Sequence, residues 1–325
     1  MRDFGHLISF HQGNLYKGYP LFLVLLFVFV SVSSQTVING VSFSKLPIDY
    51  QLVERDSTDS DRGIVLIEGE VDKSVATYDA IRVTVERDGA SYGASPYEFV
   101  LDVNADPAPF AFSIKIKSEL RNYSFIIEGL TGGSADAITR ADNVVAGDVY
   151  IIQGQSNAAA KKYSGSTADL NEQGFVRVYA NATDSDNDLI ADDNWYEGQG
   201  DGNENSPGNT GQWGMKLADD LVNAYGFPVA IFNGGDGGKQ IGWFLEKSTK
   251  RDVIYNNYER LLYRLEKTGL KGAVKAVLWS QGENIGGASK VSDYYRPFED
   301  LRNSWYGDYP KIDKIYIFQT RMVIC

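Results

Sequence analysis

The chain has 325 residues, 43% of them hydrophobic, so it is long enough for two globular domains with packed cores. It carries 31 basic and 43 acidic residues, and the resulting net charge of −12 argues against nucleic acid or an anionic membrane surface as a partner. Eight of the acids lie between residues 178 and 215, a stretch that contains neither Lys nor Arg.

An apolar segment near the N-terminus predicts export. Leu21–Val30 is a run of ten apolar residues, which is too short to cross a bilayer and is typical of the core of a signal peptide. The small residues Val32 and Ser34 favour cleavage after Ser34, and the alternative is an uncleaved anchor. We therefore expect residues 1–34 to be a signal peptide and the protein to be secreted or held in the periplasm or cell envelope, without a stable membrane span. The single cysteine, Cys325, leaves no internal disulfide.

Residues 35–146 have the pattern of an all-β domain. Apolar residues alternate with polar ones from Phe110 to Ile116, as a half-buried strand requires, and Asp88-Gly89 and Asp106-Pro107 indicate turns. This rhythm predicts a β-sandwich. The expected strands are residues 64–67, 81–85, 98–103, 110–116 and 123–127.

Residues 147–325 alternate between buried strands and helices, which predicts an α/β domain with a parallel sheet covered on both faces. The expected strands are residues 149–153, 229–233, 274–279 and 314–318, and the expected helices are residues 212–225, 253–267 and 294–305. The 3.6-residue period places two sets of side chains toward the sheet, Leu217, Leu221 and Ala224 on the first helix and Tyr258, Leu261, Leu262 and Leu265 on the second.

Ser156 follows the first of these strands in the run Gly154-Gln155-Ser156-Asn157. A buried strand that delivers a hydroxyl onto a glycine-flanked turn is how a hydrolase displays a nucleophile. The motif is one residue short of Gly-x-Ser-x-Gly, and Gly-x-Ser alone is often only a turn. Asp148, which precedes the strand core, is interpreted as structural.

Two further glycine-bearing loops follow the next two strands. They are Asn233–Gly238 and Trp279–Asn284. Because ligands bind beyond the carboxyl ends of the strands in an open parallel sheet, we expect these loops to meet the Ser156 turn at one edge.

The segments Gly147–Asn157, Asn233–Gly238 and Trp279–Glu283 resemble the SGNH (GDSL-like) hydrolases, specifically the sialate O-acetylesterase and acetylxylan esterase group, carbohydrate esterase family six. The resemblance implies a three-layer α/β/α flavodoxin-like fold and hydrolysis of acetyl esters on sugars, with no metal or organic cofactor. It assigns Ser156 as the nucleophile. The implied oxyanion hole consists of the backbone amides of Ser156 and Gly238 or Gly237 and the side chain of Gln281, with Asn157, Asn233 and Glu283 as candidate supports.

The general base is missing from the pattern. The family places Asp-x-x-His near its C-terminus, whereas the two histidines here are His6 and His11. We expect the hydrolase domain to be incomplete at its C-terminus, and the alternative is a pseudoenzyme. Glu283 could replace the base, but it is interpreted as a hydrogen-bonding support of the Gln281 loop.

Other candidate sites are weaker. Asp184, Asp186 and Asp188 are spaced as in a calcium loop, but Leu189 and Trp195 stand where glycine and glutamate are needed, so we expect a solvated loop. Trp195, Trp213 and Trp243 could stack on a sugar, although core positions are commoner for aromatic residues. Asn122 and Asn181 begin glycosylation sequons.

The sequence therefore predicts an exported carbohydrate O-acetylesterase that acts on acetylated carbohydrate through a serine acyl-enzyme. One alternative is a non-catalytic carbohydrate-binding protein that retains the pocket. The other is a lipase or thioesterase of the same fold, which the acidic, polar stretch from Asn181 to Trp213 disfavours. The pattern indicates neither the particular sugar nor the oligomeric state.

Overall fold

Alternating apolar residues form strands in the first part of the chain. Ala108–Lys117 (β8) buries every second side chain and exposes the others, as expected for a strand with one face on a core. The computed structural model describes residues 36–162, 168, 171, 173–180, 193–203, 206–245, 256–285 and 291–318. The expected signal peptide, residues 1–34, lies outside the described residues.

Two antiparallel sheets share one hydrophobic core. The first has the order β1–β2–β4–β8, and the second joins β6 and β7 to β5, then to β9 and to the first part of β10. Val65 and Ile114 of the first sheet are buried in the same cluster as Val83 and Phe125 of the second. The strands are β1 (Thr36–Ile38), β2 (Val41–Lys45), β4 (Arg62–Val71), β5 (Ala80–Arg87), β6 (Ala90–Ser91), β7 (Tyr97–Val100), β8 and β9 (Tyr123–Thr131).

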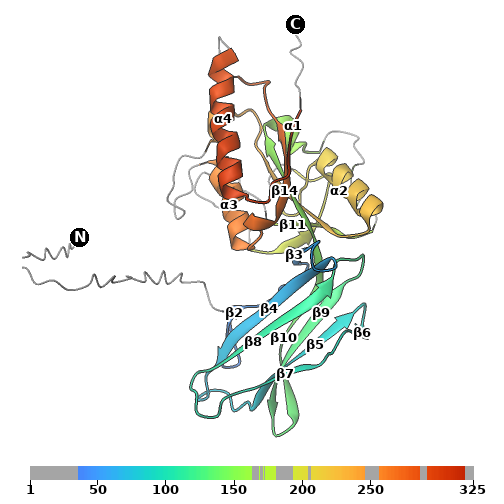
Figure 1. The fold of residues 1–325 in the computed structure, drawn as a ribbon, viewed down its shortest axis with the longest axis vertical. Helices are drawn as coiled ribbons and strands as arrows, with labels where there is room; N and C mark the ends of the chain where they lie inside the picture. Colours follow the sequence, from blue (N-terminus) through green and yellow to red (C-terminus); the bar gives the residue numbers. More distant parts are fainter. Residues whose placement is uncertain are drawn as a thin grey trace, which may run out of the picture. The chain divides into compact units, whose positions relative to one another are not determined.

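The 21-residue strand Ser134–Gly154 (β10) runs from the second antiparallel sheet into a parallel sheet without interruption (Figure 1). It pairs first with β9 in antiparallel fashion, then with the short parallel strand Leu52–Glu54 (β3), and finally with two parallel strands on either side. The predicted boundary between residues 146 and 147 thus falls within one strand. That boundary stays a prediction, and residues 35–325 form one compact unit.

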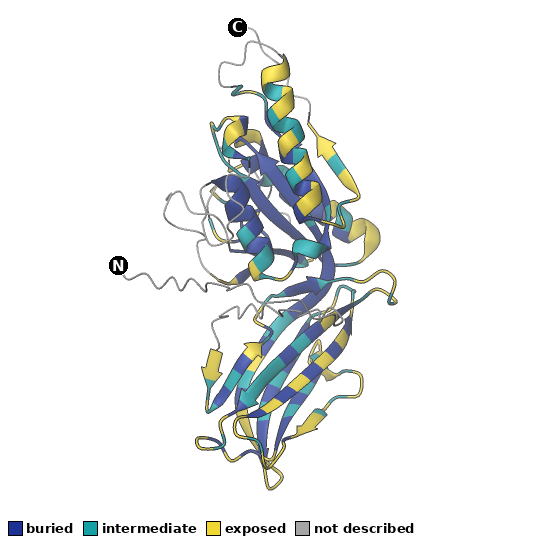
Figure 2. Cartoon of the chain, turned by 60° about the vertical axis from the view of Figure 1, so that its left-hand side comes forward, coloured by how far each residue is buried: buried dark blue, intermediate teal, exposed yellow. Residues whose placement is uncertain are grey.

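The parallel sheet has the order β12–β11–β13–β10–β14–β15, with only β12 antiparallel to its neighbour. Figure 2 shows its central strands almost entirely buried. The elements of this part are α1 (Ser156–Ala159), β11 (Val176–Tyr179), β12 (Trp195–Glu197), α2 (Gln212–Tyr225), β13 (Val229–Gly235), η1 (Ile241–Trp243), α3 (Asn257–Lys267), η2 (Lys271–Ala273), β14 (Val274–Ser280), α4 (Val291–Asp308) and β15 (Lys314–Ile317).

Alternate residues of the parallel strands enter two different hydrophobic clusters. Ile151 belongs to a cluster with Leu261 of α3 and Trp305 of α4, whereas the neighbouring Ile152 belongs to a cluster with Met215 of α2. Because successive side chains of a strand point to opposite faces, both faces of the sheet are buried under helices. The expectation of a mixed α/β chain is confirmed.

The bounds of α2 agree with the sequence, but the face predicted to be buried is wrong. Leu217 and Leu221 are only half-buried and Ala224 is exposed, whereas Met215, Ala218 and Val222 are buried. The reason is close packing on the sheet: a Cβ added to Gly214 would lie 2.7 Å from Cδ1 of Ile152. The helix therefore turns the side containing Gly214 and Ala218 toward the sheet, and Leu217 and Leu221 pack at its flank.

Other differences are smaller. The inward residues predicted for α3, Tyr258, Leu261, Leu262 and Leu265, are buried as expected. The strand predicted at residues 98–103 is the shorter β7, and β1, β2, β3, β6, β11 and β12 were not predicted. Residue 253, the expected start of α3, lies outside the described residues. Within the described part of the chain, no helix combines the length and apolar character needed to cross a membrane.

Candidate active site

Ser156 is the first residue of the short helix α1, and the turn that leads to it requires glycine at position 154. Gly154 has a φ of +136°, and a Cβ there would lie 2.0 Å from the carbonyl oxygen of Ser280. The backbone N–H of Gln155 then donates to that same oxygen at 3.0 Å. The turn is thereby fixed against the end of β14, and Ser156 is exposed beyond it.

The loop after β13 is anchored to this turn by the buried side chain of Asn233. Its Nδ2 donates to the carbonyl oxygens of Thr210 at 2.8 Å and Ala158 at 3.1 Å, while its Oδ1 accepts from the N–H of Gly235 at 2.7 Å. A Cβ on Gly235 would lie 2.1 Å from the backbone nitrogen of Ala159. Asn233 therefore holds α1 against β13, and its role as a support of the catalytic site stays a prediction.

The loop after β14 is bonded to both of the others. The Nε2 of Gln281 donates to the carbonyl oxygen of Asn284 at 2.8 Å and makes a longer contact of 3.4 Å with that of Lys239. Asn284 donates its backbone N–H to Oε1 of Gln155 at 3.0 Å and its Nδ2 to the carbonyl oxygen of Gly238 at 2.6 Å. Gln281 is buried, and its Oε1 has no hydrogen-bond partner.

Strand register places the three loops at one edge of the sheet. Gly154 is paired with Gly235 on one side and with Ser280 on the other, so the strands that precede the loops end at the same level. The structure thus brings the Ser156 turn, the Gly237-Gly238 segment and the Gln281 loop together. The roles of these residues as nucleophile and oxyanion donors stay predictions.

Asn157 connects the serine turn to Glu283. Its Nδ2 donates to Oε1 of Glu283, and its carbonyl oxygen accepts from Nε1 of Trp213 at 2.6 Å. This bond joins the serine turn to the loop after β14, and the role of Glu283 in the site stays a prediction. The hydrogen bond from Trp213 to Asn157 was not predicted, because the sequence around a tryptophan in a helix does not indicate its hydrogen-bond partner.

Sequence reasoning also missed the polar layer behind the site. Gln153 is buried in β10, donates to Oδ1 of Asn257 and accepts from Nε1 of Trp305, both at 2.9 Å. Tyr294 donates its hydroxyl to the carbonyl oxygen of Gln281 at 3.1 Å, and burial raises its pKa, so it remains a neutral donor. The glutamine within an apolar strand was the available signal, since a buried polar side chain needs partners.

Three other residues singled out in the sequence have contacts in the structure. Trp195 is a core residue, packed against Phe232 at 6.0 Å between ring centroids. Asp148 forms a bidentate ion pair with Arg55: Nη2 donates to Oδ2 at 2.7 Å and Nε donates to Oδ1 at 3.0 Å, in agreement with its structural interpretation. The oxygen Oδ1 of Asn122 accepts from Arg177 at 3.3 Å.

Trp243 lies beside the candidate site, half-buried. Its Nε1 donates to Asp236, and the ammonium of Lys239 lies 4.3 Å from its ring centroid, so it packs on the loop after β13. The acidic triplet Asp184, Asp186 and Asp188, the sequon at Asn181 and both histidines lie outside the described residues.

Comparison with known proteins identifies one family. Residues 146–318 match the family described as "Carbohydrate esterase, sialic acid-specific acetylesterase". No curated protein matches the chain.

Several solved structures are similar at low sequence identity. A carbohydrate acetylesterase from Xanthomonas citri is 17% identical with a TM-score of 0.49, and the match covers 85% of this chain and 59% of that protein. A protein from Arabidopsis thaliana is 20% identical with a TM-score of 0.36, covering 52% of this chain and 72% of its own. A β-glucuronidase from Bacteroides uniformis is 10% identical with a TM-score of 0.31, covering 84% and 32%. The chain therefore spans less than two thirds of the Xanthomonas protein's length.

Proposed function

Because the chain belongs to the sialic acid-specific acetylesterase family of carbohydrate esterases, we propose that it removes O-acetyl groups from sugars with Ser156 as nucleophile. The observation that carries the proposal is the hydrogen-bonded meeting of the three loops around the exposed serine. A site so constructed has a hydroxyl and several fixed N–H donors at one sheet edge, which are the elements of acyl transfer.

The proposed reaction has two halves. The Oγ of Ser156 attacks the acetyl carbonyl carbon and loses its proton to a general base; the C–O bond to the sugar then breaks, and the sugar oxygen takes the proton. Water next attacks the acetyl-serine, which releases acetate and restores the hydroxyl. The ester and one water together give the free sugar hydroxyl, acetate and one proton, with no change of oxidation state.

The oxyanion of each tetrahedral intermediate would be bound by the N–H groups of Ser156 and Gly238 or Gly237 and by Gln281. One Nε2 hydrogen of Gln281 is engaged by Asn284, but the second faces only the 3.4 Å contact to Lys239. A contact of that length is weak, so this hydrogen is the one available to a developing negative charge. Each such donor contributes roughly 3–4 kcal/mol to the transition state.

The base is the open element of the mechanism. The family resemblance assigns a histidine, and residues 12–325 contain none. This absence favours a second candidate function, in which the protein binds acetylated carbohydrate through the same three loops without hydrolysing it. Acetate release distinguishes the two.

For the architecture, we infer a β-sandwich from the core shared by the two antiparallel sheets, and a three-layer flavodoxin-like domain from the helix-covered parallel sheet. We also infer export, supported by the apolar run Leu21–Val30. Intact-mass analysis of protein from the culture medium or cell envelope tests this: a mass that begins at Gln35 supports cleavage, and one that includes residues 1–34 contradicts it.

The functional test is acetate release from O-acetylated xylo-oligosaccharide and from O-acetylated sialic acid by the protein expressed from its complete gene. Ser156→Ala should abolish release, and Ser134→Ala, a change at an exposed serine at the start of β10, should leave it unchanged. Equal release by wild type and Ser156→Ala would exclude Ser156 as nucleophile. A series of nitrophenyl esters should favour acetate over longer acyl chains, and a preference for long chains would indicate a lipase or thioesterase.

A further inference from the structure

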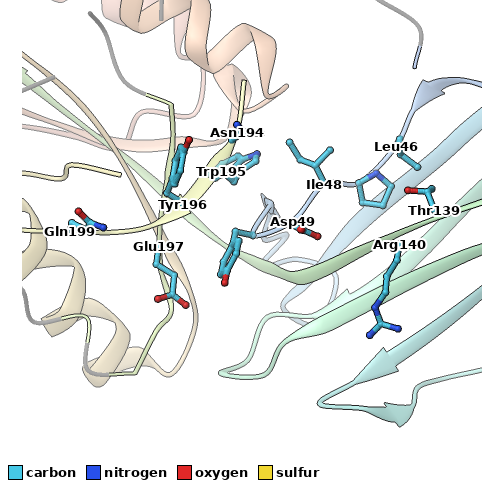
Figure 3. A pocket seen from close by; sticks show the side chains of 12 residues that line it. Leu46, Ile48, Asp49, Thr139, Arg140, Asn194, Trp195, Tyr196, Glu197 and Gln199 are labelled. Atoms are coloured by element: carbon cyan, nitrogen blue, oxygen red, sulfur yellow. The ribbon is translucent and has the colours of Figure 1, made fainter. Parts of the chain in front are cut away.

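A cavity of about 610 Å3 lies between β12 on one side and the loop of residues 46–50 with Thr139 and Arg140 of β10 on the other. Figure 3 shows its two walls: Asn194, Tyr196 and Gln199 come from β12 and its flanks, and Ile48 and Arg140 face them. Its volume falls within the roughly 300–1,000 Å3 of small-ligand sites.

The cavity is separate from the candidate active site. Glu197, which lines it, is paired with Arg177 on β11, and Arg177 is level with Ala230 near the amino end of β13. Ser156 instead follows Gly154, which is level with Gly235 at the carboxyl end of the same sheet. The cavity therefore opens near the opposite end of the strands, away from Ser156.

A strained aromatic residue forms part of the cavity wall. Tyr50 has a φ of +61°, a left-handed conformation that is unfavourable for a bulky side chain. Two contacts hold it there: its N–H donates to the carbonyl oxygen of Asp142 at 2.9 Å, and the buried guanidinium of Arg177 lies 5.5 Å from its ring centroid. Strain of this kind persists at sites where the position of a side chain matters for binding.

Planar polar side chains surround the tyrosines Tyr50 and Tyr196. They are the carboxylates, amides and guanidinium of Asp49, Arg140, Asn194, Glu197 and Gln199. Such groups suit the hydroxyls of a sugar, since each can bond two neighbouring oxygens in its plane, while an aromatic face packs against the C–H face of a pyranose ring.

The charge of the cavity selects against acidic ligands. Arg140 is already paired with Asp142 at 2.8 Å and Glu86 at 3.3 Å, so its positive charge is compensated. The buried Arg177 interacts with Glu197, so Asp49 is the carboxylate that leaves the lining negative. A carboxylated or phosphorylated ligand would be repelled, and a neutral polyhydroxylated one would not.

We propose that this cavity is a non-catalytic binding site for a neutral oligosaccharide. Tyr50 and Tyr196 supply the aromatic surface, and the side chains of Asp49, Asn194, Glu197 and Gln199 accept or donate hydrogen bonds to hydroxyls. The site does not depend on ester hydrolysis, because none of these residues belongs to the three loops around Ser156.

The test is isothermal titration calorimetry with unacetylated hexasaccharides of glucose, xylose, mannose and galactose, performed on the Ser156→Ala protein so that catalysis plays no part. At least one should bind, and Tyr50→Gly should weaken it tenfold or more. Glycine relieves the left-handed strain, which offsets part of the packing lost with the half-buried ring, and a cooperative thermal unfolding transition shows that the variant is folded. Tyr306→Ala, a change at an exposed tyrosine of α4, is the matched control and should bind as before.

An acidic hexasaccharide, oligogalacturonate, should bind at least tenfold more weakly than the best neutral one. Three results would overturn the proposal: no binding of any neutral hexasaccharide, unchanged affinity in a folded Tyr50→Gly protein, or preferred binding of oligogalacturonate. Because no acetyl group is present, failure here leaves the proposed esterase function to its own test of acetate release.

Discussion

The Asn233 side chain should contribute strongly to stability, because it bonds three backbone groups in a buried region. Asn233→Ala removes the bonds to Thr210 at 2.8 Å and Ala158 at 3.1 Å and the one accepted from Gly235 at 2.7 Å. A buried backbone group that loses its partner costs about 1–3 kcal/mol. Taking the lower value for each, we expect the free energy of unfolding to fall by about 3 kcal/mol.

Urea denaturation followed by tryptophan fluorescence measures this loss. With a slope of about 3 kcal/mol per molar urea, the midpoint should move down by about 1 M. Asn303→Ala, at an exposed asparagine of α4, should change the free energy by about 0.5 kcal/mol or less. If Asn233→Ala shifts the midpoint no more than this control, the carboxamide does not hold the loops together and the reasoning fails.

Three further predictions concern charge, pH and catalysis. Asp148→Ala removes the two-bond partner of the half-buried Arg55, which keeps only its ion pair with the exposed Asp61, and should destabilise the protein by about 2–3 kcal/mol in urea denaturation; a loss below about 1 kcal/mol would show that solvent reaches the pair. Burial raises the pKa of Tyr150 to about 12 from 10, so the folded state retains this proton to higher pH than the unfolded state. The stability that the neutral phenol contributes is present below pH 10 and is lost as pH rises toward 12. Tyr150→Phe should therefore flatten the alkaline decline in melting temperature. The 325-residue chain should release acetate from sugar esters slowly, and added imidazole should raise the protein-dependent rate in wild type but not in Ser156→Ala; rapid release without imidazole would show that another side chain serves as base.

Patterns that depend on neighbouring residues were predictable. The bounds of α2 and the meeting of the three loops followed from periodicity, from the glycine stop at Gly226 and from the rule that ligand loops gather at the carboxyl edge of a parallel sheet. The turn before Ser156 is the clearest example, since it was predicted from Gly154 and its φ of +136° is a conformation that favours glycine.

Features that depend on distant partners were not predictable. The inward face of α2 was misjudged because the close approach of Gly214 to Ile152 is a tertiary contact that outweighs the position of the leucines. Strand β12 has three residues and contains no alternation that could identify it. The polar layer of Gln153, Asn257 and Trp305 joins residues more than 100 positions apart in the chain, so no local pattern reveals it.

The continuity of β10 has a consequence for attempts to separate the parts of this chain. A protein cut between residues 146 and 147 begins in mid-strand, and it loses both β3 and Arg55. Asp148 would then be a buried carboxylate with no counter-charge, and the bared backbone beside it would invite pairing with other chains. An excised hydrolase fragment should therefore aggregate where the intact chain stays folded, and proteases should find no linker at this point to cut.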